Sequence, residues 1–107
     1  MSTGEFTETA CWGGHPVARK IAEAEPRRRV VVAGVICSTR VTAEGGTSSY
    51  ECQLDDGTGE IGLLFLGRRS VAGMVVGTRC TIEGTVIVDG GRLRVWNPLY
   101  RIEVSCD

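Results

Sequence analysis

Residues that bind metals, form disulfide frameworks or carry out catalysis are scarce in this sequence. It has one histidine, His15, and five cysteines, none of them in a C-x-x-C pair. That number and spacing argue against a zinc site and against a disulfide framework. No Ser-His-Asp or Cys-His arrangement can be placed, and no Gly-rich phosphate loop ends in Lys-Ser or Lys-Thr. The sequence therefore predicts a protein that is not an enzyme and that uses no metal or cofactor.

Long apolar segments are also missing. The first residues contain no basic stretch followed by an apolar one, which a secretory signal would need. No apolar run approaches the roughly 20 residues that span a bilayer. These absences predict a cytoplasmic protein with no membrane partner.

A strong net charge is absent as well. The formal net charge is -1, so the chain lacks the positive field of a protein that coats nucleic acid by charge alone. The distribution is uneven, because residues 27–105 carry ten arginines against eight acids, whereas residues 1–26 carry four glutamates against two cations. Every cation of residues 27–105 is arginine, which suits phosphate recognition and stacking on bases. A genome with GC-rich codons would give the same bias, so composition alone assigns no function.

Glycine, valine and isoleucine are abundant. Fifteen glycines, three prolines and several turn dipeptides favour short strands over long helices and predict an all-β protein. A chain of 107 residues has room for one core. We expect residues 1–26 to form a partly disordered tail, with a short helix at 15–25 that ends before Pro26, and residues 27–105 to form one domain.

Alternating apolar and polar residues predict five strands in that domain. The first covers residues 27–41, with Gly34 where the strand can bend to serve both halves of a barrel. Residues 100–104 alternate again, as an extension along the barrel wall. Inward-facing positions are expected at Tyr50, Cys52 and Leu54 in the second strand, Ile61, Leu63 and Phe65 in the third, Cys80, Ile82, Gly84, Val86 and Val88 in the fourth, and Leu93 and Val95 in the fifth.

Residues 67–77 interrupt the strand rhythm. The spacing of Val71, Met74 and Val75 predicts a short helix or turn that plugs one end of the barrel. Three strands, a short helix and a two-strand hairpin follow one another in the OB fold, so we predict a five-stranded OB-type Greek-key barrel with a short helix between strands 3 and 4. Another small Greek-key or SH3-like barrel is the competing architecture. OB barrels bind oligonucleotides on the face of strands two and three and in the loops that join strands one to two and four to five.

The segment Leu54-Asp55-Asp56-Gly57-Thr58-Gly59-Glu60-Ile61 is a turn between two apolar runs. Aspartate side chains hydrogen-bond their own backbone, and Gly57 and Gly59 supply positive φ, so a turn accounts for these residues without a metal or an acid–base pair. Thiols within apolar strand runs act as small hydrophobic groups. Burial is therefore predicted for Cys37, Cys52 and Cys80.

Several of these pieces, taken in order, carry a family resemblance. The turn at 54–61, Phe65, Gly84, Gly91 and the segment Asn97-Pro98-Leu99-Tyr100 resemble the OB domain of RecG-type DNA helicases. The chain also looks similar to stand-alone nucleic-acid-binding OB proteins of actinobacteria. The resemblance spans most of residues 29–102 and implies a nucleic-acid ligand, with single-stranded or branched DNA ahead of RNA. It implies the wedge part of a helicase without the motor, because the chain is too short for a helicase core.

Stacking rings and arginines are the groups that such a function uses. Trp96 beside Arg92 and Arg94 on the outward face of the fifth strand is the best combination. The predicted nucleic-acid-binding residues are Arg40, Gln53, Arg68, Arg69, Arg92, Arg94 and Trp96. Two alternatives stay open: Trp96 packs on the barrel against the tail at Trp12 or Val17, and the arginines are solvated or paired with carboxylates.

A protein-interaction module is the competing function. In that case Leu64 and Leu66, or an open barrel edge, dock a protein partner or a second copy of the chain. The near-neutral net charge is compatible with this alternative.

Overall fold

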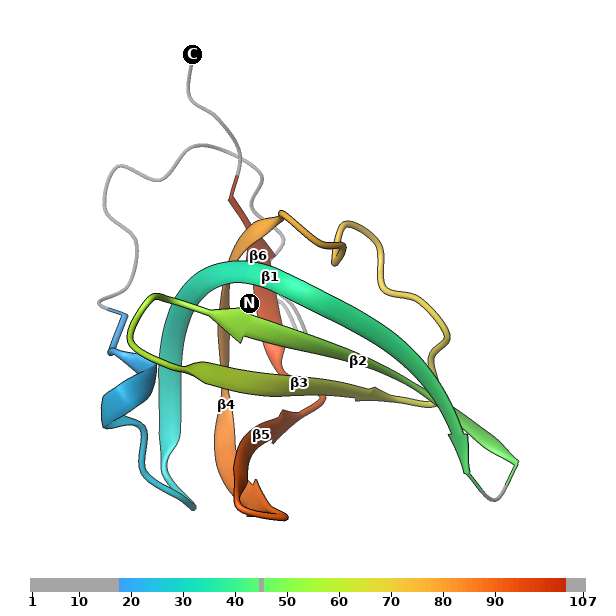
Figure 1. Ribbon diagram of the computed structural model, residues 1–107, viewed down its shortest axis with the longest axis horizontal. Coiled ribbons are helices and arrows are strands. Elements are labelled where there is room, and N and C mark those ends of the chain that lie inside the picture. Colours follow the sequence, from blue (N-terminus) through green and yellow to red (C-terminus); the bar gives the residue numbers. More distant parts are fainter. Residues whose placement is uncertain (1–17, 45, 104–107) are drawn as a thin grey trace.

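A computed structural model describes residues 18–44 and 46–103. These residues form one short 3-10 helix and six strands (Figure 1). The elements are η1 (Ile21–Glu23), β1 (Arg29–Glu44), β2 (Thr47–Asp55), β3 (Glu60–Leu66), β4 (Arg79–Asp89), β5 (Arg92–Trp96) and β6 (Leu99–Ile102).

Five strands close into a ring in the order β1-β2-β3-β5-β4. The ring closes because the long β1 pairs with β4 through its first half and with β2 through its second half. All neighbouring strands are antiparallel except β3 and β5, which are parallel. The short β6 pairs with β4 beside β5, where the extension along the barrel wall was expected. The predicted all-β class and the closed five-stranded barrel are confirmed.

The curvature of β1 is visible in Figure 1, where this strand arches over the barrel. Val35 is the position at which it changes partners, since it pairs with both Asp55 of β2 and Arg79 of β4. At Gly34 a Cβ atom would lie 2.5 Å from the carbonyl oxygen of Asp55. The missing side chain therefore allows the close approach of the two strands, as the predicted bend requires.

Alternation along the strands produces one core. The inward positions predicted for β2 and β3 are all buried, and so are Cys80, Ile82, Gly84 and Val86 of β4 and Val95 of β5. Two predicted inward positions differ: Val88 is half exposed near the end of the β4–β5 hairpin, and Leu93 is partly buried and packs against the core. The buried hydrophobic residues are Ile21, Val30, Val32, Ile36, Tyr50, Cys52, Leu54, Ile61, Leu63, Phe65, Val71, Met74, Cys80, Ile82, Val86 and Val95.

The short helix predicted between β3 and β4 was wrong, because residues 67–78 form turns. Gly67, Gly73 and Gly77 adopt φ values of 75, 80 and 94°, which no right-handed helix accommodates. The predicted plug is present in part: Val71 and Met74 are buried, but Val75 is exposed. The hydroxyl of Tyr50 donates a buried hydrogen bond of 2.6 Å to the carbonyl of Met74.

The N-terminal helix is shorter than predicted. Within residues 18–25 only Ile21–Glu23 is helical, and Ala24 is already extended. The predicted start of this helix lies outside the described residues. Ile21 is 1% exposed, so the barrel core includes a side chain that precedes the first strand.

Two of the three predicted buried thiols are confirmed. Cys52 and Cys80 are buried, but Cys37 is exposed. Cys37 is the extra residue at the register shift between Ile36 and Ser38 in the β1–β2 ladder, so it leaves the inward-facing row, and its thiol lies 3.5 Å from the carbonyl oxygen of Gln53.

Candidate functional site

A groove of about 760 Å³ crosses the outer face of the barrel. Outward-facing positions of β1, β2, β3 and β5 form it, together with the end of β4. It therefore lies between the β1–β2 hairpin and the β4–β5 hairpin. The lining residues are Arg40, Thr42, Ala43, Ser49, Glu51, Leu64, Leu66, Asp89, Arg94 and Trp96.

Strand register arranges the groove residues in rows. Arg40 pairs with Glu51, Glu51 with Leu64, and Leu64 with Trp96, so one row crosses four strands. Residues paired across neighbouring strands share a face of the sheet. The row therefore places an arginine at one end of the groove and an indole ring at the other.

Gly62, in the neighbouring row of residues, makes room for the side chain of Arg94. Gly62 pairs with Gln53 on one side and with Arg94 on the other. A Cβ at Gly62 would lie 3.4 Å from Cγ of Arg94 and 2.9 Å from Oε1 of Gln53. The absence of a side chain thus provides space that the long side chains of its neighbours use.

Glu51 joins the two arginines. Its Oε1 accepts a 2.9 Å hydrogen bond from Nη2 of Arg40, and its Oε2 lies 3.4 Å from Nη1 of Arg94. Asp89 adds a carboxylate oxygen 3.8 Å from Nε of Arg94. Two guanidinium groups therefore face two carboxylates, and the formal charges of the groove cancel. Sequence reasoning missed Glu51 and Gly62, because their contacts with Arg94 depend on the pairing of β3 with β5, which is distant in the chain.

Trp96 has a fixed backbone and an exposed ring. The next residue, Asn97, has φ 50°. Its backbone N–H donates to the carbonyl of Leu64, and its Oδ1 accepts from the N–H of Leu66. These bonds hold the end of β5 against β3, while Trp96 stays 52% exposed.

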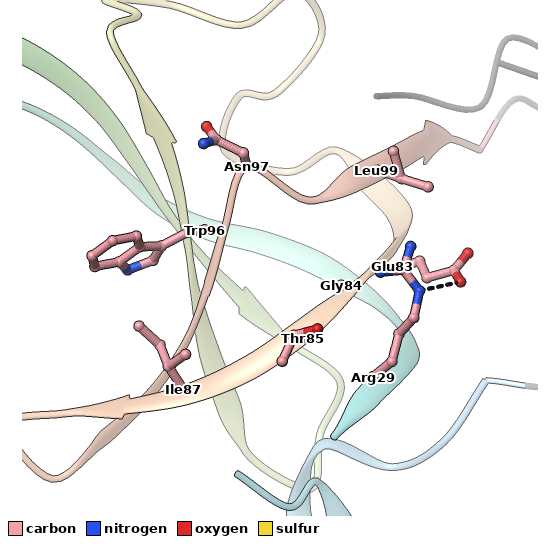
Figure 2. A pocket seen from close by; sticks show the side chains of 8 residues that line it. All are labelled: Arg29, Glu83, Gly84, Thr85, Ile87, Trp96, Asn97 and Leu99. Carbon is pink, nitrogen blue, oxygen red and sulfur yellow. Dashed lines mark hydrogen bonds and ion pairs between the residues drawn. The ribbon is translucent and has the colours of Figure 1, made fainter. Parts of the chain in front are cut away.

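The same tryptophan borders a second, smaller depression of about 320 Å³. Figure 2 shows its ring on the same side as Ile87, while the Arg29–Glu83 ion pair lies across the depression. That ion pair has a 2.9 Å contact between Nε and Oε2. The ring of Trp96 is thus accessible from two recesses on the barrel surface. Trp12 and Val17, its alternative packing partners, lie outside the described residues.

The barrel resembles a solved structure over most of its length. The solution NMR structure of a replication factor A related protein from Methanobacterium thermoautotrophicum superposes on it with a TM-score of 0.61 and 15% sequence identity. The match covers 85% of this chain and 94% of the other. The chain has an OB fold. No protein-family model and no curated protein matches the sequence. The finer resemblance to RecG-type helicases receives no support from this neighbour and stays a prediction.

The groove occupies the part of the OB barrel where such folds bind ligands, namely the face of β2 and β3 and the two flanking hairpins. Three of the seven predicted residues line it: Arg40, Arg94 and Trp96. The predicted pairing of arginines with carboxylates applies to both of these arginines.

The other four predicted residues lie outside the groove. Gln53 is in the neighbouring row and its Nε2 is 3.4 Å from Oε1 of Glu60. Arg92 is exposed at the start of β5, and Arg68 and Arg69 are exposed in the turns after β3. Within the described part of the chain, these three arginines form no ion pair.

The Asp55–Gly59 segment of the OB barrel forms the predicted turn, held by aspartate side chains. Oδ1 of Asp55 accepts from the N–H of Gly57, and Oδ1 of Asp56 accepts from the N–H groups of Thr58 and Gly59. Gly57 has φ 89°, but Gly59 does not adopt the predicted positive φ. A Cβ at Gly59 would instead lie 3.3 Å from the side chain of Ile21.

Within residues 18–44 and 46–103, no three His, Cys, Asp or Glu residues form a group that could hold a metal ion. No helix there has the length and apolar character needed to cross a membrane.

Proposed function

We propose that this protein is a non-catalytic OB module that binds single-stranded or branched DNA in the groove, with little sequence preference and with RNA as the alternative ligand. The observation that carries the proposal is the row that ends in Trp96. A half-exposed indole and an exposed arginine share one concave face at the usual ligand position of the fold. The resemblance to the RecG wedge domain supports the same ligand class.

The chemistry of the lining residues fits such a ligand. An aromatic ring stacks on any base, which gives affinity without sequence preference. Arg40 and Arg94 can contact phosphates, while Leu64 and Leu66 offer apolar contacts to sugars and base faces. None of these contacts requires a reacting group, so the proposed role is binding alone.

Trp96→Ala tests the proposal. In a titration of fluorescent oligothymidine at low salt, the wild-type protein should bind with micromolar or lower Kd. Loss of one stacked base costs about 1–3 kcal/mol, so the variant should bind about 5- to 150-fold more weakly. Trp96→Phe keeps a ring and should retain most of the affinity. Absence of wild-type binding at low salt would refute the function, and equal affinity of the alanine variant would refute the site.

Salt dependence provides a second measurement on the same complex. A single-stranded ligand loses affinity with a slope of about -0.7 per neutralised phosphate when log K is plotted against log salt. Arg40, whose side chain is 66% exposed, predicts a slope of about -0.7, and a phosphate contact from Arg94 as well would bring the slope to about -1.4. A slope near zero would show that neither arginine gains a phosphate contact.

A protein-interaction module is the second candidate. The groove carries no net charge, and Leu66 is 41% exposed beside the part-buried Leu64. Apolar side chains at the rim of a neutral groove suit a protein surface as well as a nucleic acid. A stable dimer in analytical ultracentrifugation that is unaffected by oligothymidine and is lost in Leu66→Ser would favour this candidate.

A further inference from the structure

Glu51 is unusual among the groove residues because it is a carboxylate that is 9% exposed. Both of its oxygens face guanidinium groups, at 2.9 Å from Arg40 and 3.4 Å from Arg94. A carboxylate held between arginines offers them two acceptor oxygens, as a phosphate does. Glu51 therefore occupies the arginine hydrogen-bonding capacity that a nucleic-acid backbone would use.

The two ion pairs of Glu51 differ in accessibility. The side chain of Arg94 is 20% exposed and lies between Glu51 and Asp89. The side chain of Arg40 is 66% exposed. Exposed ion pairs contribute little to stability, whereas a buried carboxylate needs a partner. Arg94 is thus the fixed partner of Glu51, and Arg40 is the partner that can leave at small cost.

We infer that Glu51 is an internal competitor for the phosphates of a bound strand. It holds Arg40 in the unbound protein and gives it up when a phosphate takes its place, while its contact with Arg94 persists. This inference rests on the proposed function. Glu51 therefore limits the affinity for nucleic acid, because a phosphate must displace its carboxylate before it can contact Arg40. The same exchange keeps the salt dependence of binding shallow.

Glu51→Gln removes the charge and keeps the shape of the side chain. Oligothymidine should bind this variant about 3- to 5-fold more tightly at low salt, with a steeper salt slope, because Arg40 is already free. Glu103→Gln is the matched control. It removes the same charge and an ion pair with Arg79, but it lies after β6 and away from the groove, so it should stay within about twofold of wild type.

Coupling between Glu51 and Arg40 gives a sharper test. In the Glu51→Gln background, Arg40→Ala should abolish the gain in oligothymidine affinity. In the wild-type background, Arg40→Ala should cause a smaller loss of affinity. Equal effects of Arg40→Ala in both backgrounds would overturn the inference, because they would show that Glu51 does not restrain Arg40.

The outcomes separate the two proposals. If wild type binds and Glu51→Gln binds no better, the inference fails and the proposed function stands. If neither protein binds at low salt, the proposed function fails and the inference with it. If Glu51→Gln does not fold, NMR of the wild-type protein replaces it. The side-chain 15N resonance of Arg40 is assigned by its absence from the spectrum of Arg40→Lys. Saturating oligothymidine should shift this resonance, and an unchanged resonance would overturn the inference.

Discussion

Asp56 connects the N-terminal segment to the barrel. Its Oδ1 accepts hydrogen bonds within the turn, while its Oδ2 accepts a 2.8 Å bond from the N–H of Ile21. Figure 1 shows η1 beside the turn between β2 and β3. The hydroxyl oxygen of Thr58 accepts a 3.1 Å hydrogen bond from the N–H of Ala22. The turn that carries part of the family resemblance therefore also fixes the buried Ile21.

The pKa of Asp56 should make stability depend on pH. Desolvation raises this pKa, but hydrogen bonds from Thr58, Ile21 and Gly59 outweigh it, so the pKa lies below its ordinary value of 3.8. A lowered folded-state pKa stabilises the protein fully above pH 3.8. The contribution is lost as the pH falls through the folded-state pKa.

Asp56→Asn should lower the free energy of unfolding by about 1–2 kcal/mol at pH 7, because an amide nitrogen cannot accept the hydrogen bond from Ile21. Urea unfolding at pH 7 and at pH 3 measures the effect, and the difference from wild type should shrink at pH 3. Asp55→Asn is the matched control, since among the described residues the side chain of Asp55 accepts a hydrogen bond from Gly57 within the turn and none from the N-terminal segment. A difference of equal size at both pH values would contradict this account.

At the scale of elements, β1 determines whether the barrel closes. One strand pairs with both β4 and β2, and Gly34 lies at the change of partner. The contact that a side chain would make there is with backbone atoms of Asp55, which cannot move aside as a flexible side chain can. A methyl group at this position would therefore push β1 and β2 apart where the ring closes.

Gly34→Ala should destabilise the protein by about 1–3 kcal/mol, the usual cost of forcing an extra carbon into a packed site. Urea unfolding followed by circular dichroism measures this. Ala33→Ser changes the preceding, part-exposed residue of the same strand and should stay within about 0.5 kcal/mol of wild type. If Gly34→Ala were as stable as wild type, close approach of β1 to Asp55 would not be required.

Element by element, alternation predicted the buried faces of β2 to β5 because a period of two is a local property of the chain. The bend at Gly34 and the turn at Asp55–Gly59 could also be predicted from the sequence, since each depends on residues that are close together in the chain. The prediction of a short helix at 67–77 was wrong, because the spacing of apolar residues does not show which glycines adopt positive φ. The contact of Glu51 with Arg94 was not predictable, because it depends on the parallel register of β3 and β5, which are distant in the chain.

At the scale of the whole molecule, two buried thiols can report on cooperativity. Cys52 lies in β2 and Cys80 in β4, and both side chains belong to the one core cluster. Burial raises the pKa of Cys52 to about 11, with Glu51 adding to the effect, and raises that of Cys80 to about 12. Neither thiol can react in the folded state, because each is shielded and almost fully protonated near pH 8.

Alkylation should therefore separate the three cysteines of the described residues into two classes. Near pH 8 without denaturant, N-ethylmaleimide should label the exposed Cys37 before Cys52 and Cys80, although desolvation and the nearby Glu60 and Asp55 raise its pKa. Cys52 and Cys80 should react together and only through global unfolding, since they share one core. Peptide mass spectrometry over time resolves each site, and Gly34→Ala should accelerate the labelling of both buried thiols. Labelling of Cys80 while Cys52 stays protected would contradict a single cooperative barrel, because it would require β4 to open independently.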